Sequence, residues 1–262
     1  MREMLWIALG VLVVGAGSAP VVARGEEEHA ILAQEVVYPS GEEQVTGYLA
    51  HPADGEGRLP AIIVIHEWWG LVPWVRENAE RFARHGYVAL AVDLYRGRSA
   101  SDRDEAHELS RGLPRDRALR DLRAAFDYLT SRPDVNPERI GVIGWCMGGG
   151  YALDAAISIP ELRAAVICYG RLTEDRSLLD NIRASVLGIF GGQDRGIPVE
   201  GVRRFEATLQ ELGKDVEVHV YPDAGHAFMN PNNQGGYREQ DAADAWARID
   251  TFFARTLQHG EG

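Results

Sequence analysis

The sequence predicts an α/β fold with a mostly parallel central sheet and helices on both faces. Two features of the 262-residue chain support this prediction. Five short runs are almost wholly apolar, which is typical of strands buried on both faces of a parallel sheet. Segments with helical periodicity alternate with these runs, as they do in chains built from strand, crossover helix and strand.

The expected strands follow one another along the chain. The five apolar runs are residues 61–65, 87–92, 140–143, 164–168 and 186–190. Ahead of them, residues 31–38 and 44–49 alternate in polarity around Pro39-Ser40-Gly41, which predicts an N-terminal hairpin. Residues 216–221 alternate more strongly than the five runs, so we expect an edge strand there.

Helical patterns separate the expected strands. They cover residues 73–85, 115–131, 146–157, 199–212 and 237–257, and a short helix is expected over 102–111. Pro73 at the first position and Gly86 after the last mark the two ends of the first helix. No gap is long enough for a separate cap domain, so the sequence predicts one domain over residues 24–262.

The charge of the chain excludes several classes of partner. The chain carries 27 Lys and Arg against 39 Asp and Glu, a formal net charge of −12. Such a surface repels phosphate backbones and anionic lipids. We therefore expect no nucleic acid partner, and a small molecule is the favoured ligand.

The first residues resemble a secretory signal peptide over residues 1–23. Residues 5–16 are apolar, Arg2 precedes them, and Val21-Val22-Ala23 supplies small residues for cleavage. Twelve residues at ~1.5 Å each are too short for a hydrocarbon core of ~30 Å. An uncleaved anchor and a first core helix are the alternatives. The prediction is an exported protein, periplasmic or secreted, without stable membrane insertion after cleavage.

The motif Gly144-Trp145-Cys146-Met147-Gly148-Gly149 joins an expected strand to an expected helix. It has the pattern of a nucleophile elbow with Cys in place of Ser. Glycines two before and two after the central residue allow the sharp turn and the close packing of strand and helix. The alternative is a glycine-rich turn with an inert buried cysteine. Cys168 is the second cysteine, and in an exported protein the two could form a disulfide.

A nucleophile needs a base and an orienting acid, and both follow later strands. Asp194 comes after the run 186–190, and His226 lies on the loop after residues 216–221. The carboxyl ends of parallel strands meet at one edge of a sheet, so we expect these side chains to converge with Cys146. Asp93 and Asp223 are the alternative acids. His66 and His107 are expected to line the site without acting as the base.

The segment His66-Glu67-Trp68-Trp69-Gly70 follows the strand 61–65. Its position predicts that the Trp68 amide joins the Met147 amide in an oxyanion hole. The His-Glu pair lacks a second His four residues on, so a zinc site is not predicted. We expect the two tryptophans to desolvate Glu67 and raise its pKa. The alternative is an ordinary acid on a surface loop.

Together, Glu67, the Cys146 motif, Gly192-Gln193-Asp194 and Ala224-Gly225-His226-Ala227-Phe228 resemble the dienelactone hydrolase (carboxymethylenebutenolidase) family of the α/β-hydrolase superfamily. The resemblance spans about residues 32–257. It implies a carboxylic ester hydrolase that needs no cofactor, with a triad of Cys146, His226 and Asp194. It further implies that Glu67 holds the resting thiol and helps to deprotonate it when substrate enters.

The resemblance also bears on substrate recognition. It places Arg103 where the family binds a substrate carboxylate, and Trp69 and His107 are expected beside it. A second family arginine, four residues after the catalytic His, is replaced by Asn230. Losing one charge-assisted contact of about 1.5–3 kcal/mol would weaken dienelactone turnover.

The resulting hypothesis is a hydrolase that cleaves a small ester or lactone through a Cys146 thioester. The alternative is an exported, non-catalytic α/β module with a Cys146–Cys168 disulfide.

Overall fold

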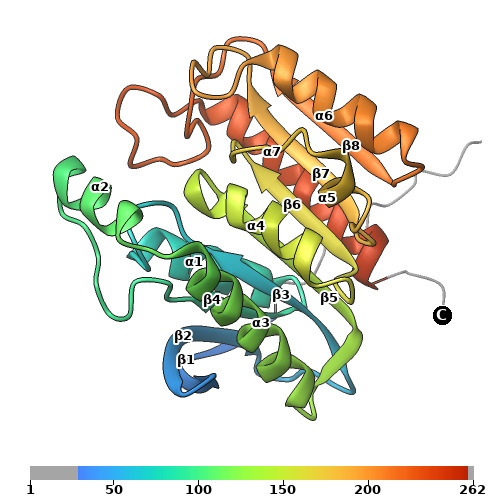
Figure 1. The fold of residues 1–262 in the computed structure, drawn as a ribbon. Coiled ribbons are helices and arrows are strands. Elements are labelled where there is room, and N and C mark those ends of the chain that lie inside the picture. Colours follow the sequence, from blue (N-terminus) through green and yellow to red (C-terminus); the bar gives the residue numbers. More distant parts are fainter. Residues whose placement is uncertain (1–28, 259–262) are drawn as a thin grey trace, which may run out of the picture.

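The computed structural model describes residues 29–258, which form an α/β structure around one eight-stranded sheet (Figure 1). The strand order is β1-β2-β4-β3-β5-β6-β7-β8. The strands are β1 (Ile31–Ser40), β2 (Glu43–Pro52), β3 (Leu59–Ile65), β4 (Val88–Val92), β5 (Val135–Trp145), β6 (Ala164–Cys168), β7 (Ser185–Gly191) and β8 (Val216–Tyr221). β2 runs antiparallel to β1 and β4, and the other pairings are parallel. The predicted hairpin and the predicted edge strand are both confirmed.

The helices cover both faces of this sheet (Figure 1). They are α1 (Pro73–Arg84), α2 (Arg103–Arg111), α3 (Arg115–Ser131), α4 (Met147–Ser158), α5 (Arg176–Leu179), α6 (Val199–Glu211) and α7 (Glu239–Phe253), followed by the π-helical turn η1 (Ala254–Gln258). Apolar residues of α3, α4 and α6 pack into one buried cluster, and those of α1 and α7 pack into the other. The predicted α/β architecture is confirmed.

The central strands are buried on both faces because alternate side chains enter different clusters. In β3, Ile63 and Ile65 belong to the cluster under α3 and α4, whereas Ile62 and Val64 belong to the cluster under α1 and α7. Successive side chains of a strand point to opposite faces, so only an uninterrupted apolar run serves both layers. This arrangement explains the five apolar runs of the sequence.

Some boundaries differ from those predicted. β5 begins at Val135, five residues before the predicted strand, because residues ahead of the apolar run still extend beside β3. α4 begins at Met147, since Cys146 has a non-helical backbone. The last predicted helix is divided between α7 and η1. The predicted leader lies outside the described residues, and within residues 29–258 no helix has the length and apolarity needed to span a membrane.

Candidate active site

Cys146 sits at the sharp turn between β5 and α4. Its backbone has φ 56° and ψ −117°, a conformation that L-residues rarely adopt. A Cβ at Gly144 would lie 2.0 Å from the Gly148 oxygen, and a Cβ at Gly148 would lie 2.4 Å from the Ile65 oxygen. Only glycine fits at these two positions, so the elbow expected from the sequence is present.

His226 and Asp194 meet at the same edge of the sheet. The Asp194 Oδ2 atom lies 2.6 Å from His226 Nδ1. The Asp194 side chain is 3% exposed, whereas the His226 side chain is 43% exposed. The acid is therefore buried behind an accessible imidazole, whose Nε2 is left to face Cys146. The ring of Tyr169 packs against His226 at 5.4 Å between centroids.

The electrostatics of the pair favour its charged form. Burial works against ionisation of Asp194, but its hydrogen bond to His226 keeps the pKa of the carboxyl below its ordinary value. Burial also lowers the pKa of His226, yet its hydrogen bonds with Asp194 and Cys146, and their negative charges, raise that pKa to about 10. These contacts thus favour an imidazolium at His226 whenever Cys146 is a thiolate.

The alternative acids and bases are placed elsewhere. Asp93 accepts hydrogen bonds from Thr46 and from the backbone beside its own strand, and Asp223 is exposed. His66 is fully buried and does not line the site, contrary to the expectation. Its Nδ1 donates to the Glu67 carbonyl oxygen at 2.5 Å, because its Nε2 already accepts from the Leu94 amide. Burial lowers the pKa of His66, which suits this neutral form.

Glu67 is buried with a neutral partner. Its side chain accepts a hydrogen bond of 2.6 Å from Asn230 Nδ2, and the residue is 2% exposed. Burial raises the pKa of Glu67 to about 7, although Asn230 and the charge of His226 oppose the shift. The Tyr169 hydroxyl lies beside this carboxyl, yet neither it nor Glu67 Oε1 makes a hydrogen bond of normal geometry. Glu67 is therefore no ordinary surface acid.

A cavity of about 730 Å³ opens over the elbow. Cys146, Met147 and His226 line it together with Trp68, His107, Ser110, Tyr169, Arg171, Leu172, Glu174, Gly196, Ile197, Pro198, Glu200, Gly201 and Arg204. His107, which was predicted to line the site, packs edge to face against the Trp68 ring with 4.8 Å between ring centroids. Within the described chain, the amides of Trp68 and Met147 donate no hydrogen bond.

Two predicted substrate-binding residues are not brought into this wall. Trp69 packs behind Trp68, with 5.1 Å between ring centroids, and does not line the cavity. Arg103 is exposed at the start of α2, one turn before His107, and also does not line it. Substrate binding by either residue stays a prediction.

Both cysteines are free thiols. Cys146 is partly accessible and lines the cavity, whereas Cys168 is fully buried in β6. Burial and the charge of Glu67 raise the pKa of Cys168 well above its ordinary value, which makes this thiol a poor nucleophile. The predicted alternative with a Cys146–Cys168 disulfide therefore has no support.

Backbone strain concentrates at this site. Four non-glycine residues between 29 and 258 have positive φ, and three of them are Cys146, Tyr169 and Ala227. Such conformations persist where surrounding structure enforces them, and they cluster at functional sites.

Within residues 29–258, no group of three His, Cys, Asp or Glu side chains is arranged to hold a metal ion.

Sequence reasoning missed two residues of this region and the contact made by a third. Tyr169 and Arg171 line the cavity directly after β6, and Asn230 holds Glu67. The first two follow the carboxyl end of a buried strand, the position that identified Asp194. No local pattern pointed to the partner of Asn230, because Glu67 lies 163 residues away in sequence.

Comparison with known proteins identifies the family. The sequence profile of the dienelactone hydrolase family matches residues 45–257. This chain belongs to the dienelactone hydrolase family. Its curated relatives include a Salmonella typhimurium LT2 protein named "Putative carboxymethylenebutenolidase", which is 36% identical over 231 residues, covering 83% of this chain and 85% of the relative.

Solved structures agree with this membership. The "Putative Dienelactone Hydrolase from Klebsiella pneumoniae subsp. pneumoniae MGH 78578" has 31% identity and a TM-score of 0.80, covering 87% of this chain and 100% of its own. The dienelactone hydrolase-like promiscuous phosphotriesterase P91 from metagenomic libraries has 26% identity and a TM-score of 0.81, covering 87% and 99%. The protein is a carboxymethylenebutenolidase-like hydrolase with an α/β-hydrolase fold, as predicted.

Proposed function

We propose that this dienelactone hydrolase family member cleaves a small ester or lactone through a thioester formed on Cys146. The observation that carries the proposal is the line of contacts from Asp194 through His226 to Cys146 at the floor of one cavity. This arrangement pairs a nucleophile with a base, and the base with an orienting acid. No cofactor takes part in the proposed reaction.

In the first half of the reaction, His226 accepts the proton of the Cys146 thiol. The thiolate sulfur attacks the substrate carbonyl carbon, and the carbonyl oxygen becomes an oxyanion. The Met147 amide at the first position of α4 and the Trp68 amide donate to this oxyanion. The carbon–oxygen bond to the leaving alcohol then breaks, and His226 gives its proton to that oxygen.

In the second half, water attacks the thioester. His226 accepts a proton from the water as its oxygen bonds to the acyl carbon, and the same two amides hold the second oxyanion. The bond between carbon and sulfur breaks, and the proton on His226 returns to the departing thiolate. The products are a carboxylic acid and the free Cys146 thiol. For a lactone, the acid and the alcohol belong to one molecule.

Other residues adjust these steps. Glu67 holds the resting thiol and, once ionised, helps His226 to deprotonate it when substrate enters, for which its pKa of about 7 is suited. Trp68 and His107 form a wall of the cavity against which the substrate packs. Arg103, which the family resemblance implies, and Trp69 are the further proposed substrate contacts. We also propose that residues 1–23 are removed and that the mature protein acts outside the cytoplasm.

Variants of the three central residues test the proposal. We expect Cys146→Ala and His226→Ala each to lower kcat on an activated ester by about 1,000-fold or more, and Asp194→Asn to lower it less. The losses do not add in a triple variant, because the residues act as one unit. Asp223→Asn is the matched control, since Asp223 is an exposed acid near His226. A slow Asp223→Asn variant beside an unaffected Asp194→Asn variant would contradict the choice of acid.

A further inference from the structure

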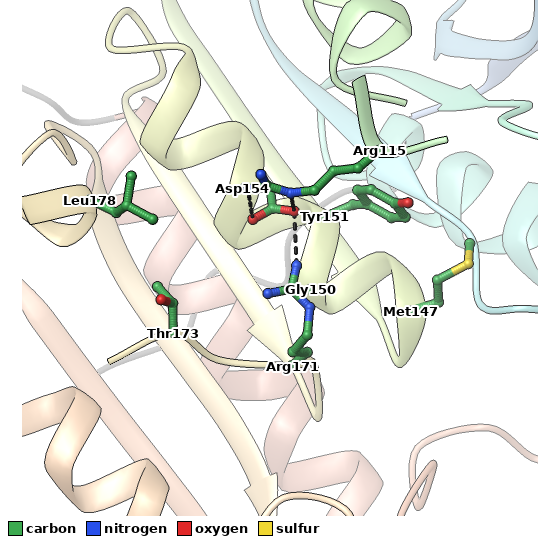
Figure 2. A pocket seen from close by; sticks show the side chains of 8 residues that line it. All are labelled: Arg115, Met147, Gly150, Tyr151, Asp154, Arg171, Thr173 and Leu178. Carbon is green, nitrogen blue, oxygen red and sulfur yellow. Dashed lines mark hydrogen bonds and ion pairs between the residues drawn. The ribbon is translucent and has the colours of Figure 1, made fainter. Parts of the chain in front are cut away.

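The described chain has a second cavity, of about 630 Å³, whose lining side chains are drawn in Figure 2. It is lined by Arg115, Met147, Gly150, Tyr151, Asp154, Arg171, Thr173 and Leu178. Met147 and Arg171 line the catalytic cavity as well. The two cavities are therefore neighbours that share one wall, and this wall begins one residue after Cys146.

Two arginines share one carboxylate in the second cavity. Figure 2 shows Asp154 between the two guanidinium groups. Arg115 donates to both Asp154 oxygens, at 3.0 and 2.9 Å, and Arg171 Nη2 donates to Oδ2 at 2.9 Å. The Asp154 side chain is 3% exposed. The group carries one positive charge in excess, and the buried carboxylate fixes where both guanidinium groups point.

Several N–H groups of Arg115 and Arg171 remain available to bind a ligand. The Arg171 and Arg115 side chains are 60% and 58% exposed. Among the residues that the structure describes, Arg171 Nε and Nη1 and Arg115 Nη1 donate to no acceptor. Guanidinium groups bind carboxylates through paired donors of this kind. The half-buried Tyr151 lies in the same cavity and adds a hydroxyl group.

The backbone fixes Arg171 against the catalytic helix. A Cβ at Gly170 would lie 2.2 Å from the Gly149 carbonyl carbon, so the two chain segments touch. The Cys146 amide also donates to the Cys168 carbonyl oxygen at 3.0 Å. The segment that leads to Arg171 therefore contacts the elbow at Cys146 and again at Gly149. These two contacts fix the position of the Arg171 backbone relative to Cys146.

One group of charged side chains in the wall of the catalytic cavity carries a net negative charge. Arg204 pairs there with both Glu174 and Glu200, so this group carries one negative charge in excess. An anionic group on a substrate is repelled by this group and attracted to Arg171 and Arg115. Arg103 lies outside both linings and stands in neither group.

We propose that the second cavity is a subsite for the anionic end of an extended ester, a carboxylate held by Arg171 and Arg115. This inference rests on the proposed function, because the scissile carbonyl of the same substrate lies at Cys146. Met147 and Leu178 supply apolar surface for the chain between the two ends. The favoured substrates are then longer than a compact lactone, and Arg171 selects them.

Two matched ester series test this subsite. One contains p-nitrophenyl monoesters of linear dicarboxylic acids from adipate to suberate, and the other contains p-nitrophenyl alkanoates of equal length. The quantity measured is the ratio of kcat/KM between the anionic and neutral esters. We expect Arg171→Met to lower this ratio about 10-fold, and Arg171→Lys to lower it less. Arg123→Met, which removes an exposed arginine paired with Asp127 and Glu161, controls for net charge.

Calorimetric titration of free suberate separates failure of the subsite from failure of the proposed function. Suberate bound by the wild type, and bound about 10-fold more weakly by Arg171→Met, supports the subsite even if neither ester series is hydrolysed. Hydrolysis of both series with the same ratio in wild type and Arg171→Met overturns the subsite. A ratio that falls in Arg103→Met, and not in Arg171→Met, overturns it in favour of Arg103.

Discussion

Asn230 Nδ2 donates a hydrogen bond of 2.6 Å to Glu67 Oε2 in the interior of the protein. Asn230 Oδ1 accepts from the Asn232 amide at 2.9 Å, which fixes the orientation of the side-chain amide. The family resemblance places an arginine at position 230, whereas this chain supplies a neutral donor. Glu67 therefore keeps a raised pKa of about 7 instead of being held fully ionised by a cation.

This pair predicts a shift in the pH dependence of activity. In our account the ionised Glu67 carboxylate helps His226 to deprotonate the Cys146 thiol, so kcat/KM rises with pH through about 7. The Asn230 hydrogen bond favours the ionised form. Asn230→Ala removes that bond, and we expect the rising limb of the pH profile to move up by about one unit.

Asn232→Ala is the control for this experiment, because Asn232 is exposed and only its backbone amide contacts Asn230. Its pH profile is expected to match the wild type. An Asn230→Ala profile with the wild-type inflection would show that Asn230 does not set the charge of Glu67.

The raised pKa of Glu67 also predicts how the stability of the protein depends on pH. Because burial raises its pKa from 4.5 to about 7, the folded protein binds this proton more tightly than the unfolded chain. The protonated Glu67 side chain contributes its full share to the free energy of unfolding below about pH 4.5. This contribution is lost as the pH rises through about 7. At ~1.36 kcal/mol per pKa unit the loss amounts to about 3 kcal/mol.

Glu67→Gln removes this loss, and its amide also offers a donor to the unpartnered Tyr169 hydroxyl. Urea unfolding near pH 8 is expected to give Glu67→Gln a free energy of unfolding above that of the wild type by as much as about 3 kcal/mol, and the difference nearly vanishes near pH 5. The exposed Glu56→Gln is the control. An equal difference at both pH values would mean that Glu67 is ionised throughout.

The two cysteines are expected to differ in reactivity. Iodoacetamide reaches Cys146 in the catalytic cavity, whereas Cys168 is fully buried with a raised pKa. Peptide mapping after brief labelling of the native protein is expected to find the modification on Cys146. Labelling becomes faster in Glu67→Ala if Glu67 holds the resting thiol. Equal labelling of Cys146 and Cys168 would count against Cys146 as the nucleophile.

Much of the fold and site could be predicted because it depends on local patterns. An uninterrupted apolar run such as residues 61–65 specifies a strand buried on both faces. Gly144 and Gly148 mark the elbow because no side chain fits there. Asp194 and His226 follow strands whose carboxyl ends share an edge, so order along the chain was enough to bring them together.

The rest depends on contacts between distant segments. The partner of Asn230 comes from a loop 163 residues away, and the shared carboxylate of Arg115 and Arg171 comes from the buried face of α4. A sequence pattern assigns residues to a loop or a helix, but it does not specify the direction in which each side chain points. Trp69 and His66 illustrate this limit, since both lie in the predicted loop but neither lines the cavity.

The predicted leader is tested by the mass of the exported protein. Residues 1–23 lie outside the described part of the chain. After expression in a host with a secretion pathway, we expect the intact mass to correspond to a mature protein that begins near Arg24. Protein that keeps residues 5–16 and stays with the membrane fraction would refute the proposed localisation.

The central claim is that Cys146 carries the acyl group during turnover. The most direct measurement is mass spectrometry of peptides from enzyme that is acid-quenched within milliseconds of mixing with p-nitrophenyl acetate. The account predicts one acetyl group on the peptide containing Cys146, released by hydroxylamine and absent in Cys146→Ala. An acetyl group on another residue, together with full activity of Cys146→Ala, would contradict the thioester mechanism.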